Sequence, residues 1–331
     1  MSVGNEMNRN KYPLSSAITN NSSLVLGCMG LGGSWDKDPI SAVDIKKANE
    51  VVDAAIDSDI TLFDHADIYT LGKAEQVFGE VLKSRPELRE LISIQSKCGI
   101  RFEDNFAPQR YDCSPEWIIS SVESSLSRLN IEQLDILMLH RPDPLMEPEL
   151  VAQAFDTLLA SGKVKHFGVS NMQHHQISYL SSALSRPLVV NQVELSLSHL
   201  AWLEEGVTSG NSGESVTNYA AGTLEYCRQN NIQLQSWGCL SQGLFTGREQ
   251  CQKALHIQKT TELVSQLAAE YQVSKEAIVL SWLMRHPANI QPVIGSTNIE
   301  RIKACSAANK IRLTREHWYA LWLCARGRAL P

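Results

Sequence analysis

The sequence predicts an α/β fold, namely a (β/α)₈ TIM barrel with an extra C-terminal helix. Eight short β-branched or apolar runs alternate with longer segments of helical period, which favours a parallel sheet with helical crossovers. A chain of 331 residues suits a closed barrel slightly better than an open doubly wound sheet. No G-x-G-x-x-G follows the first strand, so the dinucleotide fingerprint of the Rossmann fold is missing. We expect residues 1–331 to form a single barrel domain, with residues 1–20 as a poorly ordered N-terminal extension.

The predicted strands are short runs of β-branched or other apolar residues, each of which precedes a segment with helical spacing. In chain order they are Leu24–Leu26, Thr61–Phe63, Ile92–Gln95, Ile136–Leu139, Val164–Val169, Val189–Asn191, Gln233–Ser236 and Gln291–Ile294. No internal duplication and no second domain interrupts this order. The segment Leu203–Val216, which is rich in Gly, Ser and Glu, follows the sixth strand as a long loop.

The predicted helices have apolar residues three or four positions apart. The clearest begins with Ser114 as N-cap and Pro115 at the first helical position, where a missing N–H costs nothing. A last helix over residues 314–325, with Thr314 as its N-cap, places its aromatic side against the barrel. The remaining predicted helices are Ile45–Ala55, Lys73–Leu82, Glu149–Leu159, Ala220–Arg228, Thr261–Tyr271 and Ile299–Ala307.

Composition narrows the class of protein. Hydrophobic residues make up 43% of the chain and charged residues 20%, as in soluble globular proteins with a large core. The net charge is −6 and no basic block occurs, so nucleic acid is not expected as a partner. No run of 18 apolar residues or signal-peptide core is present, so we expect a cytoplasmic protein without a membrane partner. The eight cysteines lack metal spacing, which favours reduced thiols and no metal site. The oligomeric state is left open.

Candidate functional residues follow the predicted strands, because the active site of such a barrel is built at the carboxyl ends of its strands. Asp64 follows the second strand, and Tyr69 comes five residues later in FDHADIY. Lys97 follows the third strand and His140 closes the fourth. The later strand ends carry further polar or aromatic residues, which are Ser170, Asn171, Gln192, Trp237, Gly295 and Ser296.

On these residues the sequence resembles the aldo-keto reductase superfamily over nearly the whole chain. Asp64, Tyr69, Lys97 and His140 fall on that family's Asp-Tyr-Lys-His catalytic tetrad, in the motifs FDHADIY and DILMLH and around the lysine strand. Within the superfamily the sequence looks most like a group of bacterial oxidoreductases with the FDHADIY motif. The resemblance implies the reduction of a small-molecule carbonyl substrate with NADPH as cofactor, and NADH as a less favoured one.

The resemblance also implies a nicotinamide site. Ser170 and Asn171 in GKVKHFGVSN, together with Gln192 in NQVE, resemble the residues that bind the nicotinamide carboxamide. SWGCLSQGLFTG is similar to the family segment whose aromatic residue stacks on the nicotinamide, which assigns that role to Trp237. The same segment supplies two further cofactor-binding positions, Gly238 and Leu240.

The stretch IGSTNIERI resembles the segment that holds the adenosine 2′-phosphate, which assigns Gly295, Ser296 and Arg301 to the cofactor site. Gly295 stands where many members have a cation, and Cys305 replaces an asparagine that often contacts adenine. Both departures weaken the preference for NADPH over NADH. A third departure is His65, which stands where many members have Thr or Ser, and we hypothesise that this imidazole alters the pH dependence of the reaction or the fit of the substrate.

Physical chemistry suggests how the tetrad would work. Hydride delivery to a carbonyl carbon leaves negative charge on the oxygen, so a proton donor must lie within hydrogen-bond reach. A tyrosine with a pKa of about 10 is a poor acid near neutrality. A lysine ammonium about 4 Å away would favour the phenolate by up to roughly 4 kcal/mol, opposed by desolvation. We therefore expect Lys97 to lower the pKa of Tyr69, Asp64 to hold Lys97, and His140 to orient the carbonyl oxygen and relay the proton.

Three functions are compatible with this fold. The first is an NADPH-dependent reductase of aldehydes or ketones. The second is a cofactor-sensing regulatory or interaction protein on the same fold, with slow or vestigial chemistry. The third, a barrel hydrolase, lacks a nucleophile motif and metal ligands. The physiological substrate is not predicted, because it depends on long loops, here residues 31–41, 99–113 and 200–218, and on the C-terminal segment.

Overall fold

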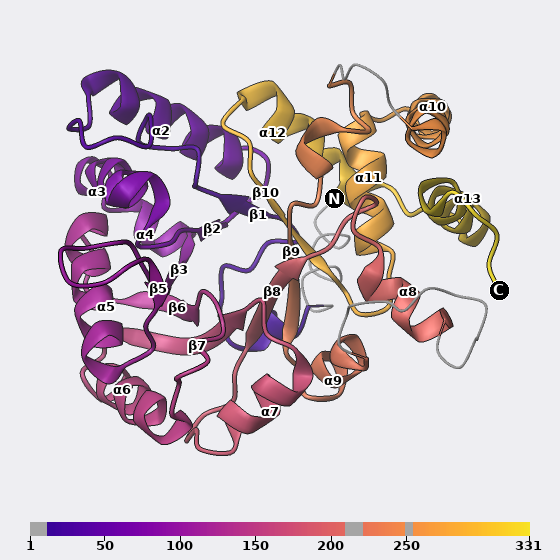
Figure 1. Cartoon of the computed structure of the whole chain (residues 1–331). Helices are drawn as coiled ribbons and strands as arrows, with labels where there is room; N and C mark the ends of the chain where they lie inside the picture. The colour runs from indigo at the N-terminus through magenta and orange to yellow at the C-terminus, as the bar shows by residue number, and fades with distance from the viewer. Residues whose placement is uncertain (1–11, 209–220, 249–253) are drawn as a thin grey trace.

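The computed structural model describes residues 12–208, 221–248 and 254–331, and its centre is a closed barrel of eight parallel strands (Figure 1). Each predicted strand has a counterpart within two or three residues of the predicted ends, so the predicted fold class is confirmed. The prediction of one domain over residues 1–331 stays a prediction. The barrel strands are β1 (Val25–Gly27), β2 (Leu62–Asp64), β3 (Ser93–Cys98), β6 (Leu134–Leu139), β7 (Val164–Ser170), β8 (Val190–Glu194), β9 (Gln233–Trp237) and β10 (Gln291–Ile294).

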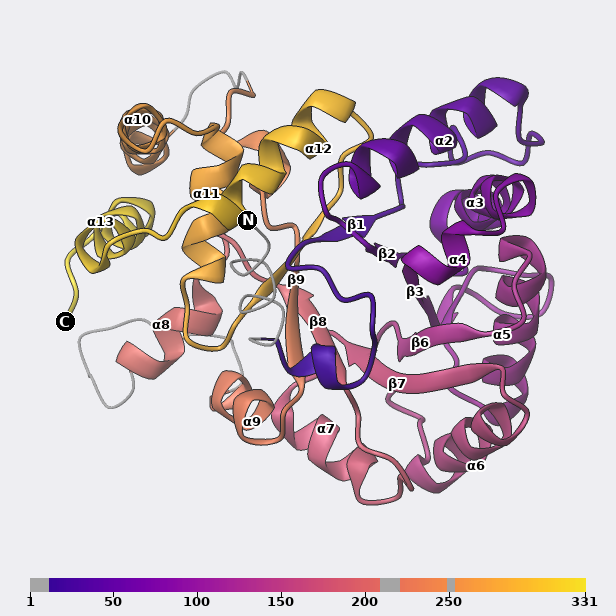
Figure 2. The ribbon, with the colours of Figure 1, turned by 180° about the vertical axis from the view of Figure 1, so that it is seen from behind.

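Helices ring the barrel, as both views show (Figures 1 and 2). Most were predicted, and Ser114 and Thr314 act as N-caps by accepting the backbone N–H groups of Trp117 and His317. The helices with predicted counterparts are α2 (Ala42–Ile56), α3 (Lys73–Ser84), α5 (Pro115–Leu129), α6 (Pro148–Ala160), α9 (Thr223–Gln229), α10 (Leu255–Glu270), α12 (Ile299–Ser306) and α13 (Arg315–Arg326).

Several elements were not predicted. The helix α11 (Lys275–Met284) is buried almost all round, so its apolar residues show no amphipathic period. The other additional elements are α4 (Leu88–Leu91), α7 (His174–Ser181), α8 (Ala201–Thr208), and a hairpin of β4 (Ile100–Arg101) and β5 (Arg110–Tyr111). The prediction of a loop over Leu203–Val216 is wrong for residues 203–208, because these residues belong to α8. Residues 209–216 lie outside the described residues.

The amino-terminal end of the barrel is closed by residues that were expected to be poorly ordered. A 3₁₀ turn, η1 (Pro13–Ser16), crosses this opening, visible as the indigo segment in Figure 2. Leu14 and Ile18 are buried there against inward-facing barrel residues such as Leu62 and Met138. The predicted extension over residues 1–20 is thus wrong for residues 12–20, because burial of these apolar side chains offsets the cost of ordering them. Residues 1–11 lie outside the described residues.

The register of the strands brings their carboxyl ends to one mouth of the barrel. Asp64 at the end of β2 pairs with Gln95, and Lys97 pairs with Met138, two residues before His140. Outside the ring, α3 and α5 approach so closely that a side chain at Gly79 would collide with the Arg128 carbonyl. This close packing fixes the helix that follows Tyr69 against the barrel wall.

The C-terminal helix α13 packs outside the ring beside α10, and two contacts tie it to the barrel (Figure 1). The indoles of Trp282 and Trp318 each donate to the other residue's carbonyl, at 3.1 and 2.9 Å. Glu204 of α8 accepts from Trp322 Nε1 at 2.8 Å and from Arg326 Nε at 2.7 Å. The buried Glu204 carboxylate therefore joins the helix that follows β8 to the end of the chain.

Candidate active site

Three of the four tetrad residues form a continuous chain of contacts at the mouth of the barrel. Lys97 Nζ lies 2.7 and 2.8 Å from the two carboxylate oxygens of Asp64, and it donates to Tyr69 Oη at 3.0 Å. A further bond from Nζ to the His65 carbonyl fixes the ammonium in place. The exposed fractions of Lys97 and Asp64 are 1% and 2%, so this ion pair is shielded from solvent.

Burial and neighbouring charges together set the pKa values of Lys97 and Tyr69. Burial opposes the charged lysine, but Asp64 and then Tyr69 outweigh it and raise the pKa of Lys97. Burial also raises the pKa of Tyr69, and the neighbouring Lys97 does not reverse that rise. The predicted lowering of the Tyr69 pKa is therefore wrong for this arrangement of the chain, because desolvation of the phenolate exceeds the attraction of the ammonium. Lys97 offsets part of that desolvation.

His140 lies beside the phenol but takes no part in the Asp64–Lys97 pair. Its ring meets that of Tyr69 edge-on, with the centroids 6.0 Å apart. Burial, followed by the charges of Lys97 and Arg141, holds the pKa of His140 well below its usual range. The imidazole is therefore neutral near pH 7, and one ring nitrogen can donate a hydrogen bond to a substrate oxygen without carrying a charge.

A layer of buried glutamines lies beneath Asp64, and the sequence analysis missed its role. Gln95 and Gln192 donate to Asp64 Oδ1 at 2.6 and 3.0 Å, and both also donate to Gln235 Oε1. Gln235 in turn donates to Gln291 Oε1 at 3.0 Å. A glutamine within or directly after each of four predicted strands was the available signal, because the interior of such a barrel is normally filled with branched apolar residues.

The residues expected to bind the nicotinamide carboxamide come together on the neighbouring strands. Ser170 pairs with Gln192 across β7 and β8, and its Oγ accepts from Asn171 Nδ2 at 2.9 Å. Trp237, at the end of β9, donates from Nε1 to Asn171 Oδ1 at 3.0 Å. An aromatic face and several amide groups thus lie beside one another, next to the tetrad.

The residues assigned to the rest of the cofactor follow β9 and β10. Gly238 has a φ of 67°, a left-handed conformation suited to glycine, and Leu240 packs partly against the core. Ser296 Oγ accepts the backbone N–H of Asn298, the N-cap of α12. Arg301 is 56% exposed and lies 3.9 Å from Glu276, so its guanidinium is held weakly.

Taken in barrel order, these positions fit a nicotinamide dinucleotide. The strands β7, β8, β9 and β10 are consecutive neighbours, so the amide groups, the aromatic face and the helix α12 follow one another around half of the mouth. No atom lies within 4 Å of a side chain built at Gly295, which leaves open space beside the N-terminus of α12. A helix N-terminus with an exposed arginine suits a phosphate group.

A cleft of about 700 Å³ adjoins the Asn171–Trp237 pair. Its wall is about half polar, with Arg141, Gln173, Glu194 and His199 among its lining residues, and the other half is apolar. The Arg141 guanidinium lies 5.9 Å from the Trp237 ring and directly follows His140 in the chain. Sequence reasoning did not single out Arg141, although a cation next to a tetrad residue was a usable signal.

His65 is fully buried beneath the site, with its ring packed edge-on against Phe78 at a centroid distance of 4.6 Å. Neither ring nitrogen has a hydrogen-bond partner among the described residues. Burial, followed by the charge of Lys97, lowers the pKa of His65 to about 3. The side chain is therefore uncharged over the range in which enzymes usually work, which argues against the hypothesis that it changes the pH dependence.

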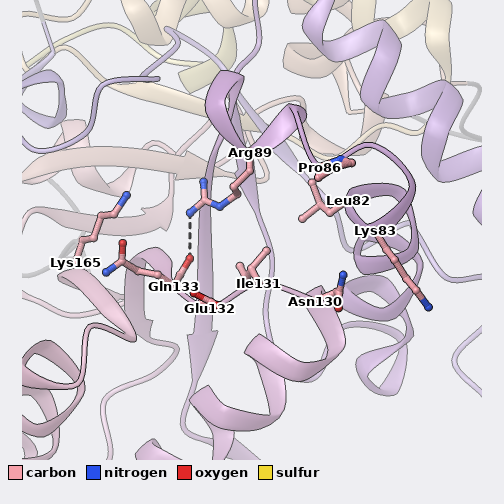
Figure 3. Close-up of a pocket in the computed structure, with 9 residues that line it drawn as sticks. All are labelled: Leu82, Lys83, Pro86, Arg89, Asn130, Ile131, Glu132, Gln133 and Lys165. Carbon is pink, nitrogen blue, oxygen red and sulfur yellow. Dashed lines mark hydrogen bonds between the residues drawn. The ribbon is translucent and has the colours of Figure 1, made fainter.

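Another groove lies at the opposite end of the barrel (Figure 3). Two of its three cations are already paired, since Arg89 and Lys165 contact the two oxygens of Asp135 at 2.8 and 2.9 Å. Arg89 also donates to the Gln133 carbonyl, the bond drawn in Figure 3. These contacts join α4 to the loop before β6 and to the first residues of β6 and β7, so they stabilise this end of the barrel.

Two broader searches of the described residues gave no additional site. None of their helices is both long and apolar enough to cross a membrane. Within the same residues, no cluster of three or more His, Cys, Asp or Glu side chains could hold a metal ion. The cysteines that the structure describes are unpaired thiols.

Comparison with known proteins was made on both sequence and structure. The model of the Aldo/keto reductase family matches residues 23–324. The uncharacterized oxidoreductase YcsN of Bacillus subtilis is 38% identical over 85% of this chain and 89% of its own length. The 6-dehydroglucose reductase of Agrobacterium fabrum is 34% identical over 93% of this chain and 95% of its own. Oxidoreductase YdhF of Escherichia coli is 36% identical, with coverages of 85% and 88%.

Solved structures agree in fold. The glycerol dehydrogenase from Gluconobacter oxydans superposes with a TM-score of 0.76 at 22% identity, covering 93% of this chain and 92% of that one. The aldo-keto reductase from Klebsiella pneumoniae in complex with NADPH gives a TM-score of 0.68 at 21% identity, with the same coverages. At such identities the likeness concerns the fold.

Proposed function

The chain belongs to the aldo/keto reductase family, and on that premise we propose that it reduces aldehydes or ketones to alcohols with NADPH as hydride donor and Tyr69 as proton donor. The family makes it an oxidoreductase of carbonyl compounds. The observation that carries the finer proposal is the position of Lys97 Nζ, which contacts both Asp64 and Tyr69 Oη inside a shielded mouth. A buried lysine between a carboxylate and a phenol has a clear use in proton transfer.

The nicotinamide supplies the hydride when it is bound. Tyr69 Oη gives its proton to the oxygen on which negative charge develops, and Lys97 Nζ stabilises the phenolate that is left. Asp64 keeps the ammonium charged and in place. Burial, followed by the charge of Lys97, lowers the pKa of His140 and keeps its imidazole neutral, and the neutral ring orients the substrate oxygen by donating a hydrogen bond.

The preference for NADPH rests on the start of α12. Ser296 and the exposed Arg301 flank the open space at Gly295, and an anionic phosphate is stabilised near a helix N-terminus. A related fold has been solved in complex with NADPH. Since Arg301 is solvent-exposed and Gly295 adds no cation, we propose a moderate rather than strict preference.

The substrate is a small carbonyl compound with hydroxyl groups. The cleft beside Trp237 offers Arg141, Gln173 and Glu194 as hydrogen-bond partners, and such polar groups discriminate against substrates that leave them unpaired. A relative of comparable length is a 6-dehydroglucose reductase. A sugar-derived aldehyde or ketone would suit this cleft better than an apolar one.

The proposal is tested with Tyr69→Phe, using glyceraldehyde and propanal as substrates that differ in hydroxyl groups. We expect kcat to fall by at least about a hundredfold with both, since proton donation contributes about 10²–10⁴-fold. Affinity for NADPH, followed by quenching of tryptophan fluorescence, should stay within about twofold. Tyr179→Phe, which alters an exposed tyrosine, is the matched control.

Retained turnover in Tyr69→Phe would refute the proton-donor assignment. A wild-type protein that binds NADPH but shows only a slow single turnover across aldehydes would favour the cofactor-sensing function. A higher kcat/KM for propanal than for glyceraldehyde would refute the proposed substrate class alone.

A further inference from the structure

The glutamine network, defined as Gln95, Gln192, Gln235 and Gln291, is completely ordered by hydrogen bonds. Its members come from four different strands and are at most 2% exposed. Each side-chain amide nitrogen donates two hydrogen bonds, so every N–H of the network has an acceptor. At its lower end, Gln291 donates to Asn21 Oδ1 and to the Ser22 carbonyl.

The charge of Asp64 dictates the orientation of each amide. An ionised carboxylate only accepts hydrogen bonds, so Gln95 and Gln192 must turn their nitrogens toward it. Their second hydrogens then require an oxygen at Gln235, whose own nitrogen must face Gln95 and Gln291. One arrangement of the amides gives every N–H of the network an acceptor, and it is anchored at Asn21 and Ser22.

Stability alone does not explain such a network. Replacing a satisfied buried polar group and its partners by apolar groups of similar shape is often nearly neutral for stability. Barrels of this class usually fill these layers with branched apolar residues. The network ends instead on the carboxylate that holds Lys97.

The network is linked to the proposed active site at Asp64 and also at Gln192, which is expected to bind the nicotinamide. Both hydrogens of its amide are used by Asp64 and Gln235. Within the described chain, Gln192 Oε1 receives no donor. The network therefore decides which atom of Gln192 is available at the nicotinamide side, while it holds Asp64 from below.

We propose that the glutamine network is a positioning device for the reaction, in which Gln235 is the central positioning residue that fixes both the Asp64 carboxylate and the amide of Gln192. The inference rests on the proposed reductase function. Removal of the Gln235 amide frees Gln95 and Gln192 to rotate, so the carboxylate, Lys97 Nζ and the carboxamide site lose their common alignment.

The test compares three substitutions of glutamine by methionine, which has similar volume. Gln235→Met removes the centre of the network and Gln291→Met removes its lower link. Gln233→Met is the matched control, because Gln233 is equally buried on the same face of β9 but bonds only the Leu234 and Asn289 carbonyls.

We expect kcat to fall about tenfold in Gln235→Met and about threefold in Gln291→Met, with Gln233→Met within about twofold of wild type. The carbonyl KM should change little. With NADPH deuterated at the transferred hydrogen, the isotope effect on kcat should rise in Gln235→Met, because hydride transfer becomes slower. Melting temperatures should not follow the order of the kcat values.

The NADPH dissociation constant, measured by tryptophan quenching, is a readout that needs no turnover. It should rise severalfold in Gln235→Met and stay unchanged in Gln233→Met. Equal loss of activity and affinity in all three variants, in proportion to their melting temperatures, would overturn the inference. If wild type has no reductase activity, the proposed function fails, and the dissociation constants alone decide this inference. If Gln235→Met does not fold, Gln291→Met with normal kcat and affinity overturns it.

Discussion

The tetrad and the start of α12 differ in how far the chain satisfies their charged groups. Lys97 is 1% exposed and has Asp64, Tyr69 and the His65 carbonyl as partners. Arg301 is 56% exposed and its nearest carboxylate, Glu276, lies 3.9 Å away. One region is complete before any ligand arrives, and the other depends on a ligand for its strongest contact.

This difference follows from the tasks that we propose for the two regions. A site that stabilises developing charge gains most when its dipoles are fixed in advance and water is excluded. A site that holds a dinucleotide phosphate must open to let the cofactor enter and leave, and an exposed cation suits that need. We therefore expect substitutions to cost far more at the tetrad than at α12.

The largest expected effect comes from Lys97→Met. It removes the ammonium from Tyr69 and leaves the Asp64 carboxylate buried without its cation, so kcat should fall by about 10²–10⁴-fold. Breaking a buried pair typically costs about 3–5 kcal/mol of folding stability, which chemical denaturation would measure. Lys163→Met, in a solvent-exposed pair with Glu123, should cost less than about 1 kcal/mol. Similar losses in both variants would mean that the buried Lys97–Asp64 pair contributes no more to stability than an exposed pair.

A smaller effect is expected from Arg301→Ala. Because the guanidinium is exposed, its loss should raise the KM for NADPH about tenfold or less, and leave kcat and the KM for NADH unchanged. Arg312→Ala, which removes an exposed arginine before α13, is the control. An equal rise of KM for both cofactors would mean that Arg301 does not bind the 2′-phosphate.

The smallest effect on catalysis is expected from His65→Thr. With a pKa of about 3, His65 stays neutral above pH 5, so the pH profile of kcat should keep its shape. Stability should respond differently. The unfolded chain takes up a proton at this histidine below a pH of about 6.5, while the folded chain does not until a pH of about 3. The wild type therefore loses stability as the pH falls through that window, and His65→Thr should lose less.

Thermal unfolding between pH 4 and pH 8 checks the stability half of that prediction, and steady-state assays check the kinetic half. A displaced kcat profile in His65→Thr would restore the hypothesis that this imidazole tunes the reaction.

Most of the fold could be predicted from local sequence patterns. The strands and the caps at Ser114 and Thr314 depend on a few consecutive residues, so the sequence predicts them well. The tetrad came from strand ends and from the family resemblance. Residues 12–18 escaped prediction because their burial depends on the barrel floor, which forms only when distant strands close.

The glutamine network could not be predicted for a related reason. Gln95 and Gln235 are 140 positions apart in the chain and meet only across the barrel interior. The alternation of side chains along a strand predicts which face of the sheet a residue takes, but not which residue of another strand it contacts across the barrel. The raised pKa of Tyr69 also depends on three-dimensional burial, and the sequence indicates the direction of that effect but not its size.

The shared carboxylate of Glu204 has a practical consequence for protein engineering. Segments near the mouth are natural targets for exchange between homologues when a new substrate range is wanted. Here α8 and α13 meet at one buried acid, through Trp322 and Arg326. A chimera that imports α13 alone would leave that acid without its donors, and one that imports α8 alone would leave Trp322 and Arg326 without their acceptor. The two segments should therefore be exchanged together.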